Sequence, residues 1–114
     1  MVSTVGPDPG TGSSESKLTF ADLELDEATQ QVRRDGRLVE LTPTEYRLLH
    51  YLLANAGRVL TREQILEAVW GYQVAGNASV LETYISYLRQ KIDTSGPGRI
   101  QTVRGVGYAL RLPR

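Results

Sequence analysis

The chain has 114 residues, of which 40% are hydrophobic, so it can bury one modest core and its length predicts a single domain. The absence of cysteine excludes disulfides and thiolate metal sites and fits a reducing cytoplasm, and no apolar run reaches the roughly 18 residues of a membrane span. The 13 basic and 13 acidic residues cancel, but acidic residues predominate up to Glu45 and basic residues predominate from Arg89 onward. The basic end can therefore either bind phosphate groups or form an ordinary solvated surface.

Residues 1–16 precede the first apolar pattern and are rich in Gly, Pro, Ser and Thr. They contain neither the basic start nor the apolar stretch of a signal peptide. Their composition predicts a flexible linker or tail, and the folded domain is expected to cover residues 17–114.

Short strands are predicted at the start of this domain. Apolar residues recur there with the spacing of strands, at Leu18, Phe20, Leu23 and Leu25. Asp35-Gly36 is a hairpin-turn signal between the runs 32–34 and 38–41. We therefore expect a small antiparallel sheet ahead of the helices.

Three helices are predicted next, because capping boxes occur at residues 42–45, 61–64 and 79–82. The first helix stops at Gly57 and has an apolar face formed by Leu48, Leu49, Leu52, Leu53 and Ala56. The second helix is short and ends at Trp70-Gly71, and its apolar residues are Ile65, Leu66, Ala68 and Val69. Residues 72–78 have no period and are predicted to form a loop, after which the third helix extends from its cap to about Asp93.

The third helix has two distinct faces. The apolar face must pack on the core and consists of Leu81, Tyr84, Ile85, Leu88 and Ile92. The opposite face consists of Ser79, Thr83, Ser86, Tyr87 and Gln90, with Glu82 and Arg89 on one flank and Lys91 on the other. Such side chains can reach base edges and phosphates in the major groove of DNA, although a solvated helix surface has the same composition.

A hairpin is predicted after the third helix. Gly96-Pro97-Gly98 marks a turn, residues 100–103 alternate as a strand, and residues 108–112 return as its partner. Arg104 lies at the tip, where it can enter a narrow groove of DNA or remain a solvated arginine on a plain hairpin. The glycines beside it do not form a phosphate loop, because no helix follows them.

These segments resemble the effector domain of OmpR/PhoB-type response regulators. The resemblance lies in LTPTEYRLLHYLLANAGRVLTREQILEAVWG, SVLETYISYLRQKID and IQTVRGVGYAL, which occur in the family's order and, with the strands before them, cover nearly all of residues 17–112. It implies an α+β winged helix-turn-helix fold with an N-terminal four-stranded antiparallel sheet, three helices and a C-terminal β-hairpin wing. It also implies sequence-specific binding of double-stranded DNA and regulation of transcription by the third helix as recognition helix.

The resemblance also implies positions for the DNA contacts. Carried over position by position, the family pattern places them at Glu82, Ser86, Tyr87, Arg89 and Gln90 on the third helix, at Thr102 and Arg104 on the wing, and at Arg62 as a phosphate ligand. Together with Ser79, Thr83 and Lys91 from the exposed face, these residues are the predicted DNA-binding set. Many relatives carry another basic residue where this chain has Gln90, so a lower phosphate affinity is expected here.

Further partners follow from the same resemblance. The segment that touches RNA polymerase in the family corresponds to Tyr72, Gln73, Val74, Ala75, Gly76 and Asn77. A phosphorylated receiver domain and a sensor kinase are expected in a parent protein, for which residues 1–16 would be the connecting linker. Head-to-tail dimers on direct repeats are common in the family, and a cytoplasmic location without membrane contact is expected.

Two other classes of function were weighed. An enzyme is disfavoured, because His50 is the only histidine and has no cysteine or carboxylate pair nearby in sequence to form a triad or metal site. No cofactor or metal is expected. A protein-interaction module that uses the exposed face of residues 79–90 is the alternative, and salt-sensitive binding to duplex DNA would distinguish it.

Overall fold

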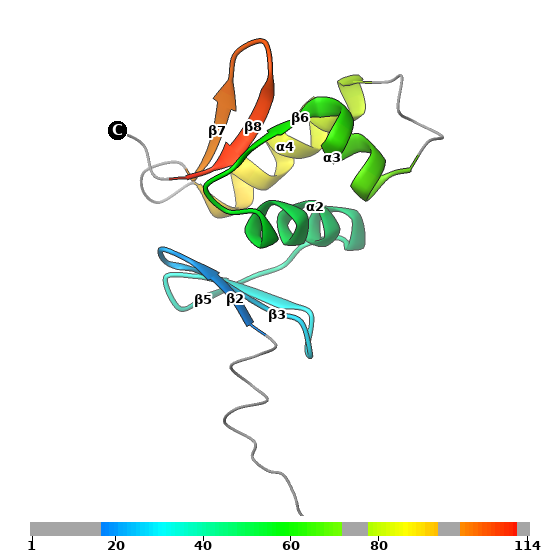
Figure 1. Ribbon diagram of the computed structural model, residues 1–114. Helices are drawn as coiled ribbons and strands as arrows, with labels where there is room; N and C mark the ends of the chain where they lie inside the picture. The colour runs from blue at the N-terminus through cyan, green and yellow to red at the C-terminus, as the bar shows by residue number, and fades with distance from the viewer. Residues whose placement is uncertain (1–16, 72–77, 94–98, 112–114) are drawn as a thin grey trace, which may run out of the picture.

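The computed structural model describes residues 17–71, 78–93 and 99–111 (Figure 1). The predicted linker at residues 1–16, the predicted polymerase-contact segment at 72–77 and the predicted turn at 96–98 lie outside the described residues. None of the helices in the described ranges is long and apolar enough to cross a membrane.

The described chain begins with a four-stranded antiparallel meander, as expected. Its strands, in spatial order, are β2 (Lys17–Phe20), β3 (Leu23–Asp26), β4 (Gln31–Arg34) and β5 (Arg37–Val39). The predicted turn joins β4 to β5, where Asp35 and Gly36 have φ angles of 54° and 79°. A two-residue turn with positive φ at both positions matches the right-handed twist of the strands. Leu23, Leu25 and Val32 are buried on the face of this sheet that packs on the helices.

Helix α2 (Pro43–Ala54) and helix α3 (Arg62–Val69) begin at the predicted capping boxes. Thr42 and Thr61 each accept a hydrogen bond from the amide three residues ahead, and the side chains of Glu45 and Gln64 accept one from the cap amide in return. These pairs satisfy amides that have no partner inside the helix. The leucines of the predicted face of α2 are all buried.

Helix α4 (Ala78–Ile92) is the longest helix and buries the predicted apolar stripe. Its start differs from the prediction, because Ser79 lies inside the first turn and is not the cap. The carbonyl of Ser79 accepts a hydrogen bond from the Thr83 hydroxyl at 3.0 Å, which is a contact between residues one helical turn apart.

A second sheet contains the predicted C-terminal hairpin and one strand that was not predicted. β7 (Ile100–Val103) and β8 (Gly107–Leu110) form the hairpin, and β6 (Val59–Thr61) pairs with the other edge of β8 to give the order β6-β8-β7. Strand β6 lies so close to β8 that a Cβ atom on Gly107 would stand 2.0 Å from the carbonyl oxygen of Leu60. The wing is therefore anchored to the segment between α2 and α3.

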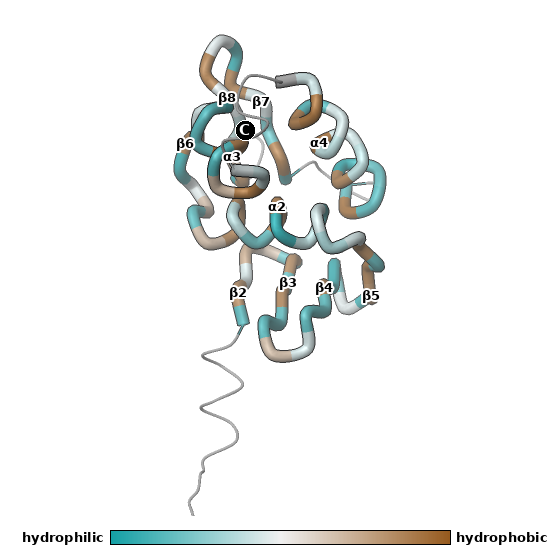
Figure 2. The backbone as a smooth tube through the Cα atoms, turned by 90° about the vertical axis from the view of Figure 1, so that its right-hand side faces the viewer, coloured by the Kyte–Doolittle hydropathy of each residue, from teal (hydrophilic) through white to brown (hydrophobic). Residues whose placement is uncertain are grey.

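The molecule is layered around α2. Figure 1 and Figure 2 show α2 between the four-stranded sheet on one side and α3, α4 and the second sheet on the other. One hydrophobic core joins these layers. This arrangement is an α+β winged helix-turn-helix, and it leaves α4 and the β7–β8 hairpin together at the end away from the four-stranded sheet (Figure 1).

Candidate nucleic-acid interface

The outward face of α4 carries the predicted polar row. Because the apolar stripe of the helix is buried, the residues opposite it are exposed, namely Ser79, Glu82, Thr83, Ser86, Tyr87 and Gln90. Tyr87 is the largest of them and remains 43% exposed. This face combines hydrogen-bonding groups with one aromatic ring and includes no apolar aliphatic side chain.

A groove of about 540 Å³ runs between α4 and the wing. Glu82, Ser86 and Gln90 line it on the helix side, and Ile100 and Tyr108 line it on the side of the second sheet. The groove is thus continuous with the exposed face of α4.

Arg89 forms part of this groove and joins α4 to the wing. Its Nε and Nη2 atoms donate to the Ile100 carbonyl at 3.3 and 3.0 Å, and Nη2 also donates to the Thr102 hydroxyl at 2.9 Å. Its guanidinium carbon lies 5.9 Å from the centre of the Tyr108 ring, within the range of a cation–π contact. Arg89 and Thr102, both predicted to contact DNA, therefore contact each other.

Arg104 occupies the turn at the tip of the wing. The turn is closed by a hydrogen bond from the Val106 amide to the Val103 carbonyl at 3.0 Å, and Gly105 supplies the positive φ of 78° that the turn needs. Within the described part of the chain, the exposed Arg104 side chain forms no hydrogen bond or ion pair. Its charge is available to a ligand.

Arg62 lies where α3, α4 and the wing meet. Its amide donates to the Val106 carbonyl at 3.3 Å, and its Nη2 atom lies 3.9 Å from a carboxylate oxygen of Glu82. The first residue of α3 is therefore beside the α4 face, as a phosphate ligand on that face would have to be.

Lys91, which was also predicted to bind DNA, has a different role in the structure. Its Nζ atom lies 2.6 Å from the buried Glu45 carboxylate in the capping box of α2. The pKa of Glu45 is below its ordinary value: burial alone would raise it, but hydrogen bonds from Lys91 and the Thr42 amide outweigh burial. Lys91 is exposed but its charge is paired with Glu45, so a phosphate group would have to compete with this carboxylate for it.

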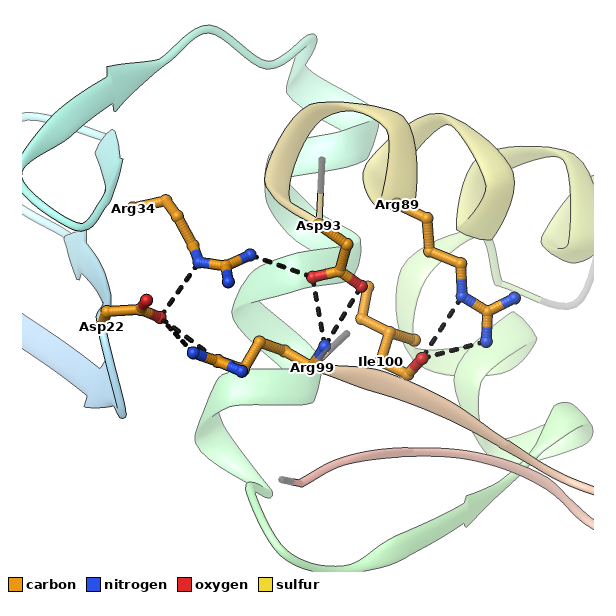
Figure 3. A network of polar contacts seen from close by, with 6 residues as sticks. All are labelled: Asp22, Arg34, Arg89, Asp93, Arg99 and Ile100. Carbon is orange, nitrogen blue, oxygen red and sulfur yellow. Dashed lines mark hydrogen bonds and ion pairs between the residues drawn. The ribbon is translucent and has the colours of Figure 1, made fainter. Parts of the chain in front are cut away.

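The basic end of the chain was predicted to be either a phosphate-binding or an ordinary solvated surface, and Arg99 fits neither alternative. Arg99 is only 7% exposed and belongs to a network with Asp22, Arg34 and Asp93 (Figure 3). Both arginines lie within 3.2 Å of carboxylate oxygens. Composition counts such residues as surface charge, whereas the fold uses them internally.

Three aromatic rings connect α3 to the exposed face of α4, a feature that the sequence analysis missed. The Trp70 and Tyr84 rings are 5.4 Å apart at 57°, and the Tyr84 and Tyr87 rings are 5.4 Å apart at 77°. Trp70 and Tyr84 are half-buried, so they support Tyr87 from inside. The spacing of three between Tyr84 and Tyr87 was a usable signal, because such residues are neighbours on a helix.

His50 has a carboxylate partner that the sequence did not reveal. Its Nε2 atom lies 2.6 Å from Glu27 Oε2, and its ring lies 6.1 Å from that of Tyr46. This cluster connects α2 to the turn after β3. No group of three potential metal-ligating side chains occurs among the residues that the structure describes.

The chain is similar to known proteins over most of its length. A family model described as "Transcriptional regulatory protein, C terminal" matches residues 36–110. Response regulator MprA of Mycolicibacterium vanbaalenii is 51% identical over 106 residues, which cover 92% of this chain and 46% of the relative. The transcriptional regulatory protein TrcR of Mycobacterium tuberculosis is 47% identical over 100 residues, which cover 88% of this chain and 39% of the relative. The chain thus spans less than half the length of these relatives.

Solved structures give the same similarity. The Klebsiella pneumoniae RstA DNA-binding domain in complex with RstA box has a TM-score of 0.74 at 30% identity, covering 83% of this chain and 96% of that one. The DNA-binding domain of E. coli CpxR has a TM-score of 0.73 at 31% identity, covering 86% of this chain and 98% of that one.

Proposed function

We propose that this chain reads duplex DNA with α4 in the major groove and the β7–β8 turn in the adjacent minor groove. The chain belongs to the family of transcriptional regulatory protein C-terminal domains and is a DNA-binding output domain of the response-regulator type. This family consists of transcription regulators and not of enzymes. One observation carries the proposal: the exposed polar face of α4 borders a groove whose other wall is the second sheet, and the wing of that sheet carries an exposed Arg104 with no hydrogen bond or ion pair to the described residues.

The residues of α4 suit the edges of bases. Gln90 can donate and accept at adenine, Glu82 can accept from the amino group of cytosine, and Ser86 and Thr83 can bond to several bases. Tyr87 offers a ring for apolar contact with a thymine methyl group and a hydroxyl for a hydrogen bond. Each of these side chains is exposed on the same face of the helix.

The remaining residues suit the sugar–phosphate backbone and the minor groove. Arg62 and Ser79 lie at the first turns of α3 and α4, where helix N-termini favour anions. Arg104 extends from the wing without an internal partner in the described chain, as an arginine that enters a narrow minor groove must. Thr102 and Arg89 form the wall between these two contacts.

The internal use of Lys91 and Arg99 leaves few cations for phosphates. With two or three phosphate contacts, the slope of log K against log salt should be about −2 to −3, since each contact contributes about −0.9. This slope is shallow for a DNA-binding protein, so specific base contacts must supply a large share of the affinity.

The partners of a parent protein are also proposals. Relatives named response regulators are about twice as long as this chain, which supports a receiver domain and a sensor kinase in a longer protein. Tyr72–Asn77 would contact RNA polymerase, and two copies would bind a direct repeat head to tail. Both inferences are supported by the family alone.

The proposed function is tested by selecting duplexes from a random pool and measuring affinity for the selected site at several salt concentrations. Enrichment of a defined site, with affinity that falls as salt rises, is the expected result. An unenriched pool together with salt-independent weak binding would contradict it and would favour a protein-interaction surface on residues 79–90.

A further inference from the structure

We propose that the partly buried network of Asp22, Arg34, Asp93 and Arg99 positions the wing relative to α4, so that the four-stranded sheet takes part in DNA binding without touching DNA. The consequence for DNA rests on the proposed function, whereas the positioning itself does not. Asp22, Arg34 and Arg99 do not line the groove of the candidate interface, and Asp93 lines it at the end of α4.

The network joins three parts of the fold. Asp22 lies in the turn between β2 and β3, and its Oδ1 atom is 3.0 Å from Arg34 Nε and 3.1 Å from Arg99 Nη2. Arg34, at the end of β4, also reaches Asp93 just beyond α4, with 3.2 Å between Nη1 and Oδ1. Two carboxylates thus neutralise two guanidinium groups, whose side chains are 6% and 9% exposed.

Asp93 and Arg99 fix where the wing begins. The Arg99 amide donates to both carboxylate oxygens of Asp93 at 3.1 Å, which ties the end of α4 to the residue before β7. The Arg99 carbonyl accepts from the Arg111 amide at 2.9 Å, so the residue that follows β8 is held at the same point. The base of the wing is therefore attached to the end of the helix.

The same base is held by the four-stranded sheet. The Asp22 carboxylate accepts a hydrogen bond from the Arg99 side chain. Ile100, which follows Arg99, accepts the hydrogen bonds of Arg89 from α4 at its carbonyl (Figure 3). A displacement of Arg99 must therefore shift Ile100, and with it the contact between α4 and the wing. The guanidinium groups of Arg34 and Arg99 are buried, and a buried charge without a partner costs several kcal/mol, so these two arginines are held to their carboxylates.

A purely stabilising role is the competing explanation, and a distance measurement separates the two. The chain has no cysteine, so Gln90→Cys on α4 and Val106→Cys on the wing provide a unique pair of spin labels at exposed sites. Pulsed electron resonance then gives the distribution of distances between α4 and the wing in the free domain. Asp22→Asn removes the negative charge that faces two arginines, and neither label is attached to a residue of the network.

We expect Asp22→Asn to broaden this distribution or shift it by about 2 Å or more. Leu53→Ala is the control, because it changes the core at α2 outside the network, and it should leave the distribution unchanged. Both variants are compared in the fully folded state. If Asp22→Asn does not fold, Arg34→Lys, which keeps the charge but cannot bridge two carboxylates in the same way, should give a smaller change of the same kind. An unchanged distribution in the folded network variant would overturn the proposal.

The effect on DNA is measured separately with the selected duplex. Arg104→Ala should lower affinity by about 5-fold to 150-fold in the otherwise unchanged domain, corresponding to a contact of roughly 1 to 3 kcal/mol. In the Asp22→Asn background this loss should shrink at least threefold, because a displaced wing no longer places Arg104 correctly, and in the Leu53→Ala background it should persist. Equal losses of affinity in both backgrounds would overturn the proposal. A domain that binds no duplex would instead contradict the proposed function, and the distance measurement would then decide the positioning role.

Discussion

The guanidinium of Arg89 donates to the hydroxyl of Thr102 at 2.9 Å, so a residue of α4 and a residue of the wing are bound to each other inside the candidate interface. The same guanidinium holds the Ile100 carbonyl and lies over Tyr108. Arg89 therefore joins the two elements that are proposed to enter the two grooves of DNA.

This junction predicts non-additive effects on DNA affinity. Arg89→Ala should weaken binding more than tenfold, because it removes every contact of the side chain with the wing, and Thr102→Val, which keeps the shape of the residue, should weaken it about threefold. In the double variant, Thr102→Val should cost little more, since its partner is already gone. Fluorescence anisotropy with the selected duplex measures all four proteins, and strictly additive losses would show that the two residues act independently.

Arg62 and Arg104 should differ in the kind of affinity that they supply. Arg62→Ala should weaken all duplexes alike and reduce the salt slope by about one, as loss of a phosphate contact does. Arg104→Ala should relax preference at A·T-rich positions beside the core site, where a narrow minor groove attracts arginine. Binding profiles across single-base variants at two salt concentrations measure both effects.

Glu82→Gln serves as the control for Arg62, because Arg62→Ala also removes the cation 3.9 Å from Glu82. If Arg62→Ala changed the order of preferred bases and Glu82→Gln did not, Arg62 would be reading bases and its proposed role would be wrong.

The aromatic contacts predict that Tyr84 acts through Tyr87. Tyr84→Leu removes the edge-to-face support 5.4 Å away while keeping an apolar side chain in the core. It should therefore alter base preference at the same position as Tyr87→Ala, and to a smaller degree. Tyr84→Phe preserves the ring contact and should bind like the unchanged protein. A change of preference at a different base position would refute this link.

The close approach of β6 to β8 predicts that Gly107→Ala is strongly destabilising. The added carbon would lie 2.0 Å from the Leu60 carbonyl oxygen, and backbone on both strands would have to move. A loss of at least about 2 kcal/mol in the free energy of unfolding is expected, in the range of the more severe core changes. Urea denaturation measures this loss.

Gly105→Ala is the matched control in the same hairpin, because Gly105 has a positive φ of 78° but nothing lies within 4 Å of its added carbon. It should cost only about 1 kcal/mol, the usual penalty for a left-handed residue other than glycine. Similar losses for both variants would mean that the clash with Leu60 is relieved easily.

Glu45 predicts a defined acid sensitivity. Its pKa is lowered in the folded state, so the folded state binds the proton less readily than the unfolded chain does. The stabilisation is therefore complete above the ordinary glutamate pKa of about 4.3 and is lost as the pH falls through the lower folded value. Stability measured from pH 6 to pH 3 should fall less steeply in Glu45→Gln than in the unchanged domain, and parallel curves would contradict this.

The helices were the most predictable part of the fold, because their signals are local. Thr42 with Glu45 and Thr61 with Gln64 form complete capping boxes within four residues, and both helices begin there. Ser79 with Glu82 has the same pattern, but α4 begins at Ala78. A capping pattern inside a helix cannot be distinguished from one at its start when the sequence before it has no clear period.

Strand β6 was not predictable in the same way. It has three residues, follows shortly after the Asn55 cap that ends α2, and ends at Thr61, which is also the cap of α3. It gains its hydrogen bonds from β8 near the other end of the chain. The exposed face of α4 followed from periodicity. The sequence could not show that Lys91 and Arg99 have carboxylate partners while Arg104 is left for a ligand, because those partners are distant in sequence. Glu45 is 46 residues from Lys91, and Asp22 is 77 residues from Arg99.

The order of strands in the second sheet also determines when the domain can become functional during synthesis. β8 is the central strand and follows both of its neighbours in the chain, so β6 and β7 have no partner until β8 has left the ribosome. The four-stranded meander pairs only sequential neighbours and can form early. A nascent chain that stops before Gly107 would therefore contain the four-stranded sheet and helices α2, α3 and α4 but no wing, so the candidate interface is the last part of the described fold to be completed.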